Sequence, residues 1–139
     1  MAYICQLKIV YQGNEYPYRM NRNIEQLVEA LQAGLQEKKG HDIAIVDLSG
    51  IDEAVCKAFV ICSGNSPSHI QALAESAARF ARERLGARPT AVDGMRNAIW
   101  VAMDYTDVIL HVFLEDARQY YDLEHLWADA PLTEIPDLD

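Results

Sequence analysis

The chain has 139 residues, of which 50% are hydrophobic and 24% are charged, so it is long enough to form one globular domain with a buried core. Twelve basic and twenty-one acidic residues give a formal net charge of −9, which argues against binding a nucleic-acid backbone and favours a partner with a basic surface. No stretch approaches the roughly 20 apolar residues of a membrane span, and the first residues lack the features of a secretion signal.

The first nineteen residues differ from the rest of the chain. They predict at most a short strand and a turn, whereas residues 20–40 repeat apolar residues on one face in the way that is typical of an amphipathic helix. Asn23 is the expected N-cap of this helix, with Gln26 three residues later, and Gly40 is the expected stop. We therefore interpret residues 1–19 as an extension or the product of a misplaced start codon.

The next elements alternate between strands and a helix. Residues 41–50 and 54–65 are rich in β-branched and aromatic residues, which predicts two buried strands. Residues 66–86 predict the clearest helix, because Ser66 can cap it, Pro67 suits its first position and Gly86 can end it. Residues 87–95 are expected to be extended and to end in an Asp-Gly turn.

The last third of the chain predicts a hairpin and a helix. Residues 98–105 and 107–114 form the hairpin, and residues 115–127 form one helix with acids in its first turn, where the helix dipole favours them. Residues 131–139 contain prolines and acids with little to bury, so we expect a loose tail. The order α-β-β-α-β-β-α predicts an α/β sandwich with a mixed sheet, in one domain over residues 20–130.

The sequence gives little support for a metal site or a cysteine nucleophile. The histidines lie far apart without the spacing of metal ligands: His41, His69, His111 and His125. The cysteines do not pair as metal ligands, and their number is typical of reduced thiols in the cytoplasm: Cys5, Cys56 and Cys62. We expect Cys62 to be a small core residue, and we expect neither a metal nor another cofactor.

The turn over residues 63–66, Ser-Gly-Asn-Ser, suggests an alternative. A glycine turn before a helix can bind an anion, and nucleotidyltransferases combine such a turn with two carboxylates that bind Mg²⁺. Here the carboxylates would be Asp104 and Asp107, but these are three residues apart, not two, and the turn lacks a lysine. Nucleotidyl transfer stays as the alternative function, although a simple helix cap at Ser66 explains the turn better.

The hairpin carries more polar and aromatic residues than a fully covered sheet requires. Alternation places Trp100, Ala102 and Asp104 on one face of its first strand, and Val101, Met103 and Tyr105 on the other. These residues indicate that part of the sheet is uncovered, where an exposed aromatic side chain commonly anchors an interface. A core Trp100 with a satisfied buried imidazole at His111 explains the pattern equally well.

Three segments in this order resemble the ribosomal silencing factor family (RsfS, also called Iojap): "FVICSGNSPSHIQALAE", "VDGMRNAIWVAMDYTDVILHVF" and "ARQYYDLEHLWADA". The resemblance extends from about Ile24 to Ala130. It implies a nucleotidyltransferase-like fold without known catalysis, and binding to ribosomal protein uL-fourteen of the large ribosomal subunit. Binding there would block joining of the small subunit and repress translation, notably in starvation.

The resemblance also implies a contact surface on the hairpin, made by Trp100, Met103, Asp104 and Tyr105, with His111 nearby. Asp104 would meet a basic group of the ribosomal protein. Direct contact with ribosomal RNA is expected to be minor, because Glu75 and Glu83 interleave with the arginines of residues 79–88. We expect a cytoplasmic, non-catalytic protein without a membrane partner, and we leave a homodimer open.

Overall fold

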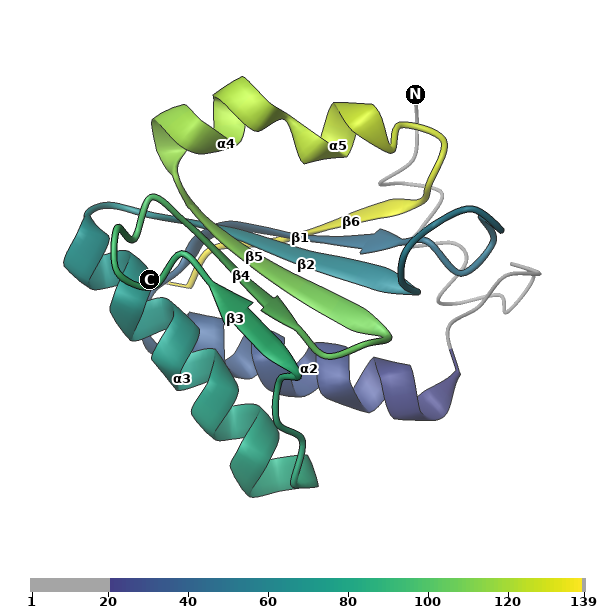
Figure 1. The fold of residues 1–139 in the computed structure, drawn as a ribbon, viewed down its shortest axis with the longest axis horizontal. Helices are drawn as coiled ribbons and strands as arrows, with labels where there is room; N and C mark the ends of the chain where they lie inside the picture. The colour runs from purple at the N-terminus through teal and green to yellow at the C-terminus, as the bar shows by residue number, and fades with distance from the viewer. Residues whose placement is uncertain (1–20, 139) are drawn as a thin grey trace.

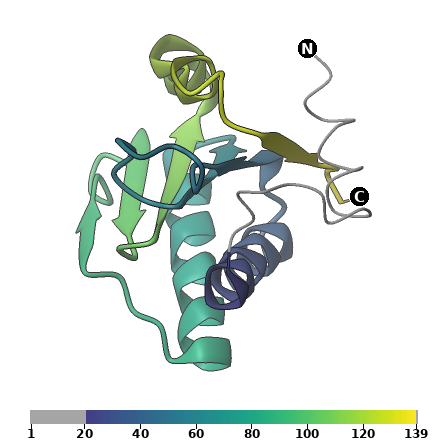
Figure 2. The ribbon, with the colours of Figure 1, turned by 90° about the vertical axis from the view of Figure 1, so that its right-hand side faces the viewer.

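The computed structural model describes residues 21–138, which form a mixed six-stranded sheet with helices on both faces (Figures 1 and 2). The strand order is β3-β4-β5-β2-β1-β6. The helices are α2 (Arg22–Glu37), α3 (Pro67–Leu85), α4 (Glu115–Tyr121) and α5 (Leu123–Leu126). The strands are β1 (His41–Asp47), β2 (Ala58–Gly64), β3 (Ala91–Asp93), β4 (Trp100–Asp104), β5 (Val108–Leu114) and β6 (Leu132–Ile135). The predicted α/β fold with a mixed sheet is confirmed.

The parallel pair of β2 and β5 forms the centre of the sheet. Every residue of β2 is buried, because helices cover both of its faces. On one face, residues such as Val60 and Leu110 join a core with α2 and α3. On the other face, Phe59 and Phe113 join a smaller core with Leu123 on α5. Burying a side chain of this size stabilises the fold by roughly 1.5–3 kcal/mol.

The chain uses the predicted caps at α3 but not at α2. The Oγ of Ser66 accepts the N–H of His69 at 3.2 Å, and Gly86 ends α3 in the left-handed region with φ 65°. The predicted cap at Asn23 is wrong, because the Oδ1 of Asn21 accepts the N–H of Ile24 at 3.0 Å. The predicted extension over residues 1–19 and the start at Met20 lie outside the described residues.

The prediction of a loose tail over residues 131–139 is wrong for most of that segment. β6 pairs with β1 in antiparallel register, with Ile135 opposite Ile43 and Leu132 opposite Val46. Beyond the strand, Oδ1 of Asp137 accepts a hydrogen bond from the N–H of Asp42 at 2.9 Å. The tail is ordered because β1 has an open edge, so the folded domain extends past the predicted boundary at residue 130.

Two further differences concern short elements. Residues 91–93, expected only to be extended, form β3 and pair with β4. The single helix predicted over residues 115–127 is two, because Asp122 adopts the left-handed region with φ 49° between α4 and α5. None of the helices in the described part of the chain has the length and apolarity needed to cross a membrane.

We predict that Gly34→Ala destabilises the protein, because α2 and α3 touch at this glycine. A Cβ at residue 34 would lie 2.6 Å from the Cα of Ala77 and 2.7 Å from the carbonyl oxygen of Ser76. These are backbone atoms, so the overpacking cost of roughly 1–3 kcal/mol exceeds the helix-propensity gain of about 1 kcal/mol. Urea unfolding measures the difference. Glu29→Ala, an exposed position on the same helix, should change stability by less than about 0.5 kcal/mol.

Candidate interaction surface

The hairpin of β4 and β5 presents a partly uncovered strip of the sheet, which we name the docking face. Antiparallel pairing places Trp100 opposite Phe113, Ala102 opposite His111 and Asp104 opposite Ile109, so all six side chains share one face. Four of these side chains are half-buried and so reach the surface: Trp100, Ala102, Asp104 and Ile109. Trp100 contacts Tyr121 of α4, which is 48% exposed. The docking face is therefore Trp100, Ala102, Asp104, Ile109 and Tyr121.

Trp100 is the aromatic centre of the docking face. Its ring lies 4.5 Å from the ring of Tyr121 and stacks on Phe113 at 4.9 Å between centroids. Its indole Nε1–H donates a hydrogen bond to Nδ1 of His111 at 3.0 Å. The ring is held on several sides while it remains half-buried, so it is a preorganised apolar contact.

His111 lies behind this surface and not on it. Its side chain is buried, with 7% exposure, and burial lowers its pKa from 6.5 to about 4. The imidazole is therefore neutral at pH 7, and because Nδ1 accepts a hydrogen bond, the proton is on Nε2. That Nε2 has no hydrogen-bond partner among the described residues.

Met103 and Tyr105 lie on the opposite side of the sheet. Both are buried, with 4% and 8% exposure, in the core that contains α2 and α3. Burial raises the pKa of the Tyr105 phenol, and the nearby charge of Arg82 opposes that rise. The five residues expected to form one contact surface thus divide between two faces of the sheet, and only Trp100 and Asp104 reach the docking face.

Asp104 has a structural contact as well as a place on the surface. Its Oδ1 accepts the N–H of Thr106 at 2.7 Å and so stabilises the turn between β4 and β5. Thr106 sits in the left-handed region with φ 73°, where glycine is favoured. Thr106 is therefore a strained position, and its hydrogen bond to Asp104 offsets part of that strain.

The parts of the nucleotidyltransferase alternative lie at opposite ends of the strands. Asp104 is opposite Ile109, which pairs with Phe59 near the start of β2, whereas the Ser63–Ser66 turn begins at its end. Phe59 and Gly64 are five residues apart, or roughly 17 Å at about 3.3 Å per residue. A backbone donor of this turn is also already used, since the N–H of Asn65 donates to Nδ1 of His69 at 2.9 Å and cannot bind a phosphate at the same time. This arrangement contradicts a shared active site.

The cysteines in the described part of the chain are not poised as nucleophiles. Cys62 is fully buried, which confirms its predicted place in the core, and burial raises the pKa of its thiol to about 12. Burial likewise raises the pKa of the Cys56 thiol to about 11. Both thiols are protonated at neutral pH, and a protonated thiol is a poor nucleophile.

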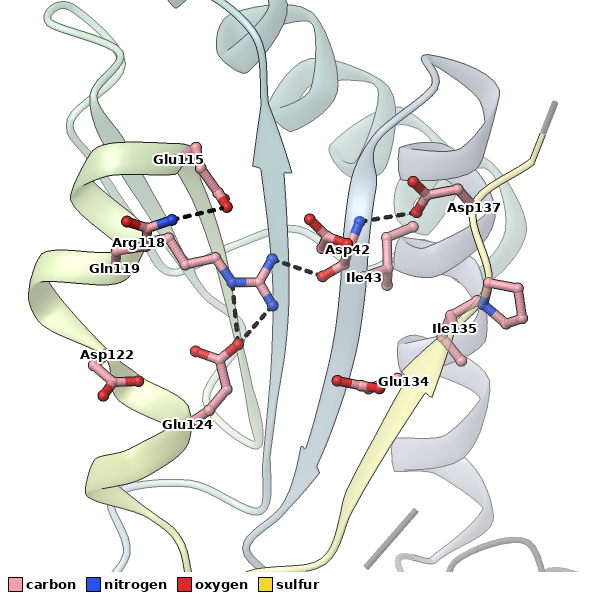
Figure 3. Close-up of a pocket in the computed structure, with 11 residues that line it drawn as sticks. Asp42, Ile43, Glu115, Arg118, Gln119, Asp122, Glu124, Glu134, Ile135 and Asp137 are labelled. Atoms are coloured by element: carbon pink, nitrogen blue, oxygen red, sulfur yellow. Dashed lines mark hydrogen bonds and ion pairs between the residues drawn. The ribbon is translucent and has the colours of Figure 1, made fainter. Parts of the chain in front are cut away.

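Arg118 attaches α4 and α5 to the sheet, and its importance was not evident from the sequence (Figure 3). Its Nη1 donates to the carbonyl oxygen of Asp42 at 2.6 Å and to the Oγ of Ser63 at 2.8 Å. Its Nε and Nη2 donate to one carboxylate oxygen of Glu124, at 3.1 and 2.6 Å. Ser63 in turn donates to Glu115 at 3.1 Å. The only signal in the sequence is a lone arginine between acidic residues.

An acidic groove of about 790 Å³ opens beside Arg118 (Figure 3). Its charged lining consists of Arg118 and carboxylates from both sides of the groove: Asp42, Glu115, Asp122, Glu124, Glu134 and Asp137. A metal ion would need a cluster of at least three histidine, cysteine, aspartate or glutamate side chains. Residues 21–138 contain no such cluster.

Comparison with known proteins decides the family. The model of the family described as "Ribosomal silencing factor during starvation" matches residues 21–139. The chain belongs to this family. The ribosomal silencing factor RsfS of Bacillus subtilis is 38% identical over 113 residues, which cover 81% of this chain and 94% of that protein.

Other relatives of this silencing factor agree with that assignment. A crystal structure of a Chromobacterium violaceum protein superimposes with a TM-score of 0.71 at 28% identity, covering 84% of this chain and 91% of that one. The mouse protein named "Mitochondrial assembly of ribosomal large subunit protein 1" is 24% identical over 102 residues, which cover 72% of this chain and 44% of the mouse protein. The protein is thus a ribosome-associated regulator of translation.

The buried imidazole of His111 predicts an acid-sensitive fold. The unfolded chain binds a proton at His111 below about pH 6.5, whereas the folded chain binds it only near pH 4. Protonation of His111 therefore does not affect folding stability above pH 6.5, and it lowers the stability as the pH falls from 6.5 towards 4, by an amount on the order of 3 kcal/mol. Urea unfolding at pH 7 and pH 4.5 should show a larger loss for the wild type than for His111→Asn. Equal losses would contradict the assignment.

Arg118→Ala should loosen the layer formed by α4 and α5. The change leaves Glu124 without its partner and removes the donors to β1 and β2, so we expect a loss of about 2 kcal/mol in urea unfolding. Arg118→Lys should recover part of the loss, because it keeps the charge but not the fork of donors. Arg96→Ala, at an exposed position, is the matched control and should be nearly neutral. A neutral Arg118→Ala would show that the helices are held by apolar contact alone.

Proposed function

We propose that this silencing factor binds the large ribosomal subunit through ribosomal protein uL-fourteen and sterically blocks joining of the small subunit. It would act without catalysis, in the cytoplasm, and slow translation when nutrients are limited. The family match supports the silencing role, and the name of the mouse relative points to the large subunit. The observation that carries the choice of surface is the contact of the half-buried Trp100 ring with Tyr121, on the same face of the sheet as the Asp104 carboxylate.

The docking face has the chemistry of a protein interface. Tyrosine and tryptophan are enriched among residues that dominate binding energy, and a ring that is already held loses little conformational entropy on binding. Trp100 and Tyr121 supply this rigid apolar area, while Ile109 extends it along β5. Asp104 sits at the end of β4 and offers a carboxylate to a basic group of the partner.

The overall charge supports a basic protein partner. A formal net charge of −9 steers the chain towards a positive surface and away from exposed phosphates. We propose that Trp100 and Asp104 contact the partner directly. Met103, Tyr105 and His111, which are buried, would support these two residues from within the sheet.

Asp104→Arg should abolish most of the binding to the large subunit. It places a positive charge against a basic partner, a repulsion that we expect to weaken binding by at least about tenfold. The measurement is co-sedimentation of the purified protein with large subunits on sucrose gradients, together with the yield of joined ribosomes. Wild type should migrate with the large subunit and lower that yield, and the variant should do neither.

Two further variants separate charge from structure in this experiment. Asp104→Asn retains an oxygen that can accept the Thr106 N–H, so it removes the charge and spares the turn. Glu29→Arg makes the same reversal on α2, across the sheet from the docking face. Asp104→Asn should bind less tightly than wild type and Glu29→Arg should bind normally. Unchanged binding by Asp104→Arg would remove the docking face from the mechanism.

A further inference from the structure

We propose that His111 is a positioning residue of the docking face, which fixes the indole of Trp100 from inside the core and does not itself touch the partner. This inference rests on the proposed function. It assigns a role to a buried polar side chain on β5 that neither fold stability nor direct contact with a partner explains.

The register of the hairpin brings the two rings together. His111 lies opposite Ala102, and Trp100 is two residues before Ala102 on the same face. Diagonal neighbours of this kind lie about 7–8 Å apart, within reach of large side chains. Ala102, which lies between them on β4, is too small to separate the two rings. The resulting bond from Nε1 of Trp100 to Nδ1 of His111 is 3.0 Å long.

This imidazole is a costly choice for a core position. Its Nε2 has no hydrogen-bond partner among the described residues, and its other contacts are aromatic: the Phe59 ring at 4.7 Å and the Phe113 ring at 6.1 Å. A buried polar atom without a partner destabilises a fold, so an apolar residue would suit this position better if packing were its only role. Within residues 21–138, the one hydrogen bond of the His111 side chain is the one that orients Trp100.

The hydrogen bond restricts the orientation of the indole. If the ring turned outwards, the buried Nδ1 lone pair of His111 would lose its only donor. The contacts with Phe113 and Tyr121 flank the indole but do not depend on where its nitrogen lies. His111 therefore selects one ring orientation among those that the aromatic neighbours allow, and the same apolar edge is always offered to the partner.

The geometric part of the inference is tested by NMR of the indole N–H in a Trp127→Phe background, which leaves one tryptophan signal. In the parent protein, the Trp100 indole proton should be protected from exchange with solvent. His111→Asn places an amide oxygen near the position of Nδ1 and should retain much of that protection. His111→Leu offers no acceptor and should lose it. Equal protection in the two variants would overturn the assignment.

The functional part is tested by binding to purified large subunits. His111→Leu should weaken binding roughly three- to tenfold, the worth of one hydrogen bond, while His111→Asn stays within about twofold of wild type. In a Trp100→Phe background, which has no indole N–H, the two His111 variants should bind alike. If His111→Leu still weakens binding in that background relative to His111→Asn, His111 acts through general structure and the inference fails.

The outcomes separate this inference from the proposed function. Wild-type protein that does not bind the large subunit overturns the proposed function, and the positioning role falls with it. Wild-type binding with equal affinity for His111→Leu overturns the positioning role alone. If His111→Leu does not fold, as judged by circular dichroism, the comparison of His111→Asn with wild type decides: loss of indole protection with unchanged binding overturns the inference.

Discussion

The hydrogen bonds of Arg118 hold the smaller helical layer of this protein in place. α4 and α5 have no fully buried residue of their own, so apolar contact attaches them only through partly buried side chains such as Ala117 and Leu123. One guanidinium joins α4 to the start of β1, the end of β2 and Glu124 of α5. Tyr121 follows Arg118 by one helical turn, so the aromatic contact with Trp100 depends on this polar cluster.

The docking face exists because that helical layer is small. With seven and four residues, α4 and α5 are only about 10 and 6 Å long. On their face of the sheet they lie over the central strands and leave β4 and β3 uncovered (Figure 2). A longer layer would bury Trp100 and Asp104 completely. The short one leaves an aromatic ring and a carboxylate at the surface of a rigid sheet, which suits recognition of a basic protein better than catalysis.

Local signals in the sequence were sufficient for the parts of the fold that depend on neighbours in the chain. Ser66 and Gly86 delimit α3 through contacts within one turn, and alternation correctly separated Trp100 from Met103. Long-range contacts could not be predicted in this way. Arg118 bonds to groups 55 and 76 residues away, and β6 is ordered only because β1 has room for it. The expected contact surface divides between two faces of the sheet because family resemblance identifies important residues without saying whether they are exposed.

The pairing of β6 with β1 also determines how far the chain can be shortened. A variant truncated after Ala130 would lack β6. The backbone N–H and C=O groups on that edge of β1 would then be unpaired, beside apolar side chains such as Ile43 and Ile45. Such an edge is a template for strand pairing between molecules, which leads to aggregation. The residues that look least structured in the sequence therefore protect the protein from association with copies of itself.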